Sequence, residues 1–195
     1  MFIELTDHLR CPEAHEEQYL VLLPDRMDGR SVKQGQLGCP VCGRTFAFRE
    51  GIVDFGPVTQ AEDAPTALSA DAIATLAGVS GPGGYFVLVG SPAGAWKSLS
   101  ELLPGVALVA VNPPSEVADE PGVSVLRGSR LPLKSRSMRG VVLGKGYAAS
   151  EGWIREAARV TLPGLRIVGE GVNPAADLIE LLASAEGVWV GSPRR

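Results

Sequence analysis

Short runs of apolar residues recur from residue 85 onward, and they constrain the fold more than any other feature of the chain. The runs are rich in valine and leucine and are bounded by glycine, proline or charged residues. Continuous apolar runs of this length are typical of strands that are buried on both faces of a sheet. We predict strands over residues 85–90, 106–111, 123–126, 140–143, 165–168 and 188–190.

Segments with helical signals lie between these runs. Ser69 is a candidate N-cap for a helix that stops at Gly78, and Ser150 is a candidate N-cap for a helix through SEGWIREAARV. We also predict helices over Ala95–Leu103 and from Asn173-Pro174 through AADLIELLASA, where the proline suits the first helical position. Strands that alternate with helices predict an α/β fold with a mostly parallel sheet.

The composition changes sharply near residue 56. The first segment holds all three cysteines and both histidines, and a stretch rich in Pro, Ala and acidic residues follows it. We predict a small β-rich metal-binding domain over 1–56, a linker and helix over 57–84, and an α/β domain over 85–195. The chain shows no signal-peptide pattern and no apolar window of the ~20 residues that span a bilayer. We therefore expect a cytoplasmic protein without membrane association.

The motif CPVCG, with Cys39 and Cys42, is the most specific motif in the chain. Two cysteines at this spacing can bind one metal ion from a tight turn, and CPEAH supplies Cys11 and His15 upstream. Together they form the Cys3His set of a closed structural zinc site, and strands near 19–23 and 31–37 would bring the two halves together.

Other ligand sets and other roles remain open. His8 is the rival fourth ligand, and Glu13 and Asp7 are weaker ones. The three thiols could instead be unconnected, with Cys39 and Cys42 as a redox pair or a disulfide. The strand-like RTFAF after CPVCG does not resemble the helix that follows a thioredoxin-type motif, so we favour zinc.

The first segment resembles the small zinc-ribbon proteins that activate tRNA and protein methyltransferases. LRCP and LGCPVCGRTFAFREGIVDF carry this resemblance, which covers about residues 9–56. The second cysteine usual in that family is replaced by Ala14 or His15. The resemblance implies a zinc ribbon and a protein partner.

The second part resembles Rossmann-like SAM-dependent methyltransferases. FVLVGSPAGAW resembles their glycine loop, RLPLKSRSMRGVVLG the segment before the fourth strand, and WIREAARVTLPGLRIVGEG the helix, turn and fifth strand. This resemblance implies a methyltransferase-like sheet, with Gly90, Gly94 and Asn112 as the residues left to bind SAM.

The chemistry of that family is largely missing from this chain. Its members have acidic residues where this chain has Leu88, Asn112, Ser129 and Arg139, and a glycine where it has Pro92. Each lost charge-assisted acceptor costs about 1.5–3 kcal/mol of binding free energy, and proline removes a backbone donor. We therefore expect SAM binding to be weak or absent.

Three other patterns carry less weight. GSPAGAWKS lacks the adjacent Gly-Lys of a phosphate loop. NPPS follows the second predicted strand and ends in Ser115 rather than an aromatic residue, so it indicates a turn. The basic residues between Arg127 and Arg139 could contact RNA, but no aromatic residue lies among them and the net charge is −4. We expect Trp153 and Trp189 to lie in the core or an interface.

Two functions therefore remain. The favoured one is a non-catalytic pseudoenzyme: a zinc-binding scaffold or regulatory subunit without catalytic residues, which holds a protein partner or a second copy of itself. The alternative is a SAM-dependent methyltransferase, acting on RNA, with an N-terminal zinc ribbon. A third possibility is that the ribbon activates a separate enzyme.

Overall fold

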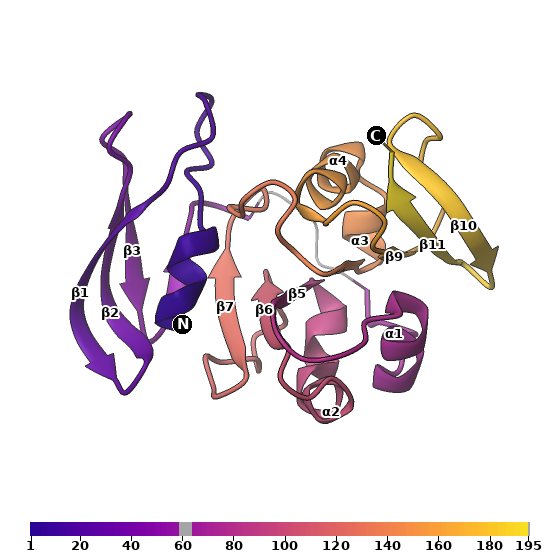
Figure 1. The fold of residues 1–195 in the computed structure, drawn as a ribbon, viewed down its shortest axis with the longest axis horizontal. Coiled ribbons are helices and arrows are strands. Elements are labelled where there is room, and N and C mark those ends of the chain that lie inside the picture. Colours follow the sequence, from indigo (N-terminus) through magenta and orange to yellow (C-terminus); the bar gives the residue numbers. More distant parts are fainter. Residues whose placement is uncertain (59–63, 195) are drawn as a thin grey trace.

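The computed structural model describes residues 1–58 and 64–194, and the strands that it describes form one sheet of 11 strands (Figure 1). The strand order is β1-β2-β3-β4-β7-β6-β5-β8-β9-β11-β10. The N-terminal segment and the α/β part therefore lie at opposite ends of one continuous sheet.

The centre of the sheet is parallel. Its strands are β5 (Tyr85–Val89), β6 (Ala107–Val111), β7 (Val123–Arg127), β8 (Val141–Leu143) and β9 (Ile167–Glu170). β5 pairs with β6 on one side and with β8 on the other, so the chain order reverses there. The predicted α/β class is confirmed, and each predicted strand overlaps the strand that forms.

The C-terminal end is a β-hairpin, so the helix predicted from Asn173-Pro174 through AADLIELLASA is wrong. β10 (Ile179–Ala185) and β11 (Val188–Pro193) pair antiparallel, and β11 pairs antiparallel with β9. Glu186 and Gly187 join them with φ angles of 51° and 76°, which are typical of a two-residue type I′ turn. Pairing with β11 overrides the helix propensity of the alanine and leucine residues in β10.

The N-terminal segment begins with a 3₁₀ helix, η1 (Ile3–His8), and continues as an antiparallel ribbon. Its strands are β1 (Val21–Asp28), β2 (Ser31–Gly38), β3 (Thr45–Arg49) and β4 (Ile52–Asp54). β4 then pairs in parallel with β7, where Val53 lies opposite Leu126 and Asp54 opposite Arg127. This pairing joins the ribbon to the parallel sheet.

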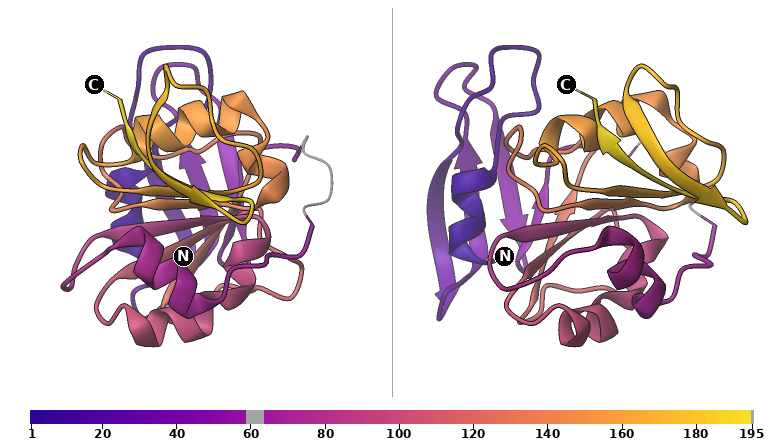
Figure 2. Two further views of the ribbon diagram at one scale, coloured as in Figure 1. Left: turned by 90° about the vertical axis from the view of Figure 1, so that its right-hand side faces the viewer. Right: turned by 45° about the vertical axis from the view of Figure 1, so that its right-hand side comes forward.

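Helices cover both faces of the sheet (Figure 2). α1 (Ala70–Ala77) and α2 (Trp96–Leu102) lie on one face, and α3 (Lys145–Ala148) and α4 (Glu151–Val160) on the other. As predicted, the Ser69 hydroxyl accepts a 3.2 Å hydrogen bond from the Ala72 N–H, and Gly78 ends α1 in the left-handed conformation. Ser150 precedes α4, but its side chain makes no capping hydrogen bond.

Two hydrophobic cores result, one on each face. Phe86 and Leu88 of β5 face the core formed with α1 and α2, whereas Val87 and Val89 face the core that contains α4. This second core also contains Leu37 and Phe46 of the ribbon. Trp153 and Trp189 are buried in it, as predicted for core residues.

The connections on either side of β7 contain no helix. Residues 112–122 and 128–140 contain neither an α nor a 3₁₀ helix. The predicted linker 57–84 contains α1, but its residues 59–63 lie outside the described part of the chain, as does Arg195 of the predicted domain 85–195. In the described ranges, no helix has the length and apolar character that a membrane span requires.

Candidate functional site

Four side chains that could bind a metal ion come from two distant segments and lie together at the tip of the ribbon. They are Cys11, His15, Cys39 and Cys42, and their ligand atoms all lie within 4.8 Å of one another. The Sγ atoms of Cys11 and Cys42 are 3.8 Å apart, and Cys39 Sγ is 3.5 Å from His15 Nε2.

These separations fit a tetrahedral metal centre. With metal–sulfur bonds of about 2.3 Å and metal–nitrogen bonds of about 2.0–2.1 Å, tetrahedral angles place two sulfurs about 3.8 Å apart. The same angles place sulfur and nitrogen about 3.5 Å apart. The four side chains therefore suit a single ion that has no open coordination position.

The local backbone supports this arrangement. The Gly43 N–H donates a 3.0 Å hydrogen bond to the Cys39 carbonyl and closes the turn, in which Gly43 has φ +71°. Burial opposes ionisation of Cys39, but backbone N–H groups of Cys42 and Val41 outweigh it and lower the pKa of that thiol to about 7. Burial raises the pKa of Cys11 to about 12.

The geometry favours His15 over His8 as the fourth ligand. His15 Nδ1 lies 2.7 Å from the Glu16 carbonyl oxygen, and donation there leaves Nε2 free to bind a metal. His8 lies outside the cluster and packs edge-on against Tyr85, with ring centroids 4.8 Å apart. Of the weaker candidates, Glu13 forms an ion pair with Arg44, and Asp7 lies outside the cluster.

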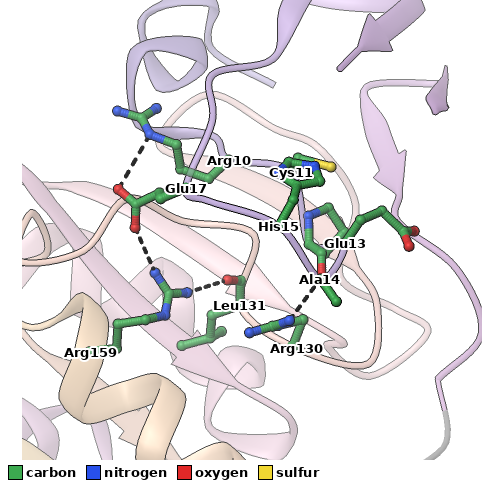
Figure 3. Close-up of a pocket in the computed structure, with 10 residues that line it drawn as sticks. Arg10, Cys11, Glu13, Ala14, His15, Glu17, Arg130, Leu131 and Arg159 are labelled. Carbon is green, nitrogen blue, oxygen red and sulfur yellow. Dashed lines mark hydrogen bonds and ion pairs between the residues drawn. The ribbon is translucent and has the colours of Figure 1, made fainter. Parts of the chain in front are cut away.

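Charged side chains connect residues 11–17, named the metal-binding loop after the candidate ligands Cys11 and His15, to α4 and to the connection after β7 (Figure 3). Glu17 forms ion pairs with Arg10 at 3.6 Å and with Arg159 at 3.3 Å. Arg130 donates to the Pro12 carbonyl at 2.8 Å and pairs with Glu156 at 3.1 Å. A cavity of about 370 Å³ lies between this network and the metal-binding loop.

The same network sets the acidity of its carboxylates. Burial alone would raise the pKa of Glu156, but hydrogen bonds from Arg159 and Arg130 outweigh it and lower the pKa. Burial is likewise outweighed at Glu17, where the Ser135 hydroxyl and N–H groups and then Arg159 lower the pKa.

Backbone hydrogen bonds hold the glycine turn after β5 in place. Gly90 has φ +75°, and η2 (Ser91–Ala95) follows it as a 3₁₀ turn. The Gly90 N–H donates to the Val111 carbonyl at 3.0 Å, and the Ala93 N–H donates to the Gly90 carbonyl at 3.1 Å. Pro92, Ala93 and Trp96 are buried, while Gly94 is exposed with no neighbour near the position of a Cβ.

The Asn112 amide is bonded to the protein itself. Its Nδ2 donates to the Gly128 carbonyl at 2.8 Å, and its Oδ1 accepts from the Gly128 N–H at 2.9 Å. Asn112 also has φ +48°, a conformation that asparagine tolerates better than most residues. The side chain predicted to meet a cofactor ribose thus joins the ends of β6 and β7.

The other replaced acidic positions also have structural roles or face solvent. Leu88 is fully buried in the core, and Ser129 is exposed. Arg139 donates to the carbonyls of Ser80 at 2.6 Å and Gly81 at 2.8 Å. None of these three side chains supplies a carboxylate.

The basic residues that cluster in the sequence have different surroundings in the structure. Arg139 holds the loop before β5, and Arg130 holds the metal-binding loop. Arg127, Lys134 and Arg136 are exposed. The role of Arg130 was missed by sequence reasoning, because its partners Pro12 and Glu156 lie far away in the chain.

No known protein family and no curated protein matches the chain by sequence. Solved methyltransferase structures resemble part of it. A protein from Methanococcus maripaludis that is described as a SAM-dependent methyltransferase has a TM-score of 0.47 and 13% identity, covering 65% of this chain and 84% of that one. A methyltransferase assigned to antibiotic biosynthesis in Anabaena variabilis has a TM-score of 0.42 and 21% identity, covering 52% and 43%.

A chain from a complex between the Haloferax volcanii Trm112 methyltransferase activator and a methyltransferase also matches. It has a TM-score of 0.38 and 21% identity, covering 45% of this chain and 45% of that one. This chain thus spans less than half of the matched Anabaena and Haloferax chains. All three scores are below 0.5, so the functional conclusions depend on the geometry of this chain alone.

Proposed function

We propose that this chain is a non-catalytic scaffold or regulatory subunit, built on a methyltransferase-type sheet and stabilised by a structural zinc ion. The Asn112 side chain carries this proposal, because both of its polar atoms are bonded to Gly128. A SAM ribose could be bound there only if these two hydrogen bonds broke. The buried Pro92 and Trp96 support the same view of the neighbouring turn.

Zinc is the metal that best suits the four side chains. Three thiolates and an imidazole favour zinc over the oxygen-preferring cations, and spacings of 3.8 and 3.5 Å match its tetrahedral bonds. A site filled by four protein ligands has no position for substrate, so the ion would stabilise the ribbon.

The outer edge of the ribbon supports a protein partner or a second copy of the chain. β1 is an edge strand, in which Val21 and Leu23 are 52% and 61% exposed, and Tyr19, two residues before the strand, is 57% exposed. β4 is paired on both sides, with β3 and with β7, so it is not free to pair with a separate enzyme. Partner binding would therefore use β1 or another surface.

Calorimetric titration with SAM tests the non-catalytic role. We expect a dissociation constant for SAM in the millimolar range or weaker. A micromolar dissociation constant would overturn the proposal in favour of a SAM-dependent methyltransferase. Light scattering after gel filtration would show whether the chain forms a stable oligomer.

The two histidines provide a matched test of the metal centre. We expect about one zinc ion per chain, and His15→Ala should weaken zinc binding at least tenfold in a chelator competition while His8→Ala leaves it unchanged. A loss confined to His8→Ala would assign the fourth ligand to His8. A metal-free native chain would overturn the zinc assignment.

A further inference from the structure

A basic groove lies between α4 and the base of the C-terminal hairpin. Its volume is about 920 Å³, and four arginines line it together with a single acidic residue, Asp177. These arginines come from three separate parts of the chain: Arg136, Arg155, Arg159 and Arg194. In Figure 1, α4 and the C-terminus lie beside each other at this place.

Two of the four guanidinium groups already have partners. Arg155 forms an ion pair with Glu151 one turn earlier in α4. Arg159 bonds Glu17, Glu156 and the carbonyls of Leu131 and Leu133. Both arginines line the groove, and Arg159 also connects α4 to Glu17 and to the connection after β7.

The other two guanidinium groups have no hydrogen bond or ion pair within the described part of the chain. Arg136 and Arg194 are both exposed, yet their backbones are held in place. The Arg136 N–H donates to the Arg159 carbonyl at 2.9 Å, and the Arg194 N–H donates to the Leu178 carbonyl at 3.2 Å. By contrast, Arg130 and Arg139 use their guanidinium groups to bind backbone carbonyls.

The remaining lining selects among anionic ligands. Ala158, Leu178 and Pro193 give the groove apolar surface, but none of the residues that line it is aromatic. Unpaired nucleic-acid bases usually stack on aromatic side chains, so this lining disfavours single-stranded RNA. The volume lies within the range of small-molecule sites. Arginine donates two parallel hydrogen bonds to a phosphate, and two uncompensated guanidinium groups suit a dianion better than a single carboxylate.

We propose that this groove binds a small organic phosphate, with the phosphate between Arg136 and Arg194 and the organic part on the apolar surface. The site is independent of the proposed zinc and scaffold functions, because none of its unpaired groups contacts the metal centre or the turn after β5. A result in the SAM or zinc titrations that contradicts those proposals would therefore leave the groove proposal unchanged.

Calorimetric titration of the full chain with phenyl phosphate, inorganic phosphate and benzoate tests this proposal. Phenyl phosphate should bind at least tenfold more tightly than either of the other probes. Arg136→Gln and Arg194→Gln should each weaken its binding about tenfold or more, because each removes a charge-assisted contact. Arg49→Gln, at an exposed arginine of β3, makes the same change in net charge and should alter affinity less than twofold.

Equal losses in all three variants would mean non-specific charge attraction and overturn the site, as would unchanged binding in Arg136→Gln and Arg194→Gln. Tighter binding of a single-stranded RNA without terminal phosphates than of phenyl phosphate would overturn the small-molecule assignment. Arg136 has φ +52°, so its variant is checked by thermal unfolding. Arg194→Gln lies in ordinary exposed backbone and decides the outcome if Arg136→Gln does not fold.

Discussion

Substitution of Asn112 separates a structural role for this side chain from a role in cofactor binding. Asn112→Ala removes the 2.8 and 2.9 Å hydrogen bonds to Gly128. Two neutral hydrogen bonds contribute about 1–3 kcal/mol to the free energy of unfolding. Alanine must also adopt φ +48°, which costs about 1 kcal/mol more. We expect a total loss of about 2–4 kcal/mol, a large part of the stability of an ordinary domain.

Two companion variants divide this loss into its parts. Asn112→Gly loses the same hydrogen bonds but adopts the left-handed backbone freely, so it should be about 1 kcal/mol more stable than Asn112→Ala. Asn112→Asp introduces a carboxylate, which cannot donate to the Gly128 carbonyl. We expect it to be less stable than the wild type and still unable to bind SAM.

Urea unfolding of the zinc-saturated chain measures these differences as shifts in midpoint at constant slope. The reasoning would be refuted if Asn112→Ala unfolded within about 0.5 kcal/mol of the wild type. It would also be refuted if Asn112→Asp bound SAM at micromolar concentrations, because Asn112 would then belong to a cofactor site.

Two further predictions concern the junction between the ribbon and the sheet. The pKa values of Glu17 and Glu156 are lowered in the folded chain, so their ion pairs stabilise it above pH ~4.5. This stabilisation is lost as the pH falls through the folded pKa values. The urea midpoint should therefore decrease between pH 7 and pH 3, and Glu156→Gln should make this decrease smaller. Gly128→Ala would place a Cβ 3.1 Å from Phe55 Cβ and should lower the free energy of unfolding by about 1–3 kcal/mol. An unchanged urea midpoint would contradict this prediction.

Local signals predicted some elements well. The Ser69 cap and the Gly78 stop define α1 through neighbouring residues alone, and both act as expected. The β5 strand was equally clear, because its continuous apolar run suits burial on both faces. Such elements need no knowledge of distant contacts.

Prediction was less successful for segments whose structure depends on contacts with residues distant in the sequence. AADLIELLASA has helical residues, but the Glu186-Gly187 turn allows it to pair with β11 instead. The short strand β4 could be seen as part of a motif, but nothing in its own residues shows that it pairs with β7. The hydrogen bonds of Asn112 could not be predicted from the sequence either, because its partner, Gly128, lies 16 residues away.

The ribbon and the closed turn are physically connected. β4 pairs with β7, and the Phe55 N–H then donates to the Arg127 carbonyl at 2.8 Å. This places Phe55 against Gly128, the residue that Asn112 holds, and Phe55 also packs on Phe46 of the ribbon at 4.9 Å between ring centroids. Opening the Asn112 side chain toward a ligand would therefore disturb contacts that reach the ribbon.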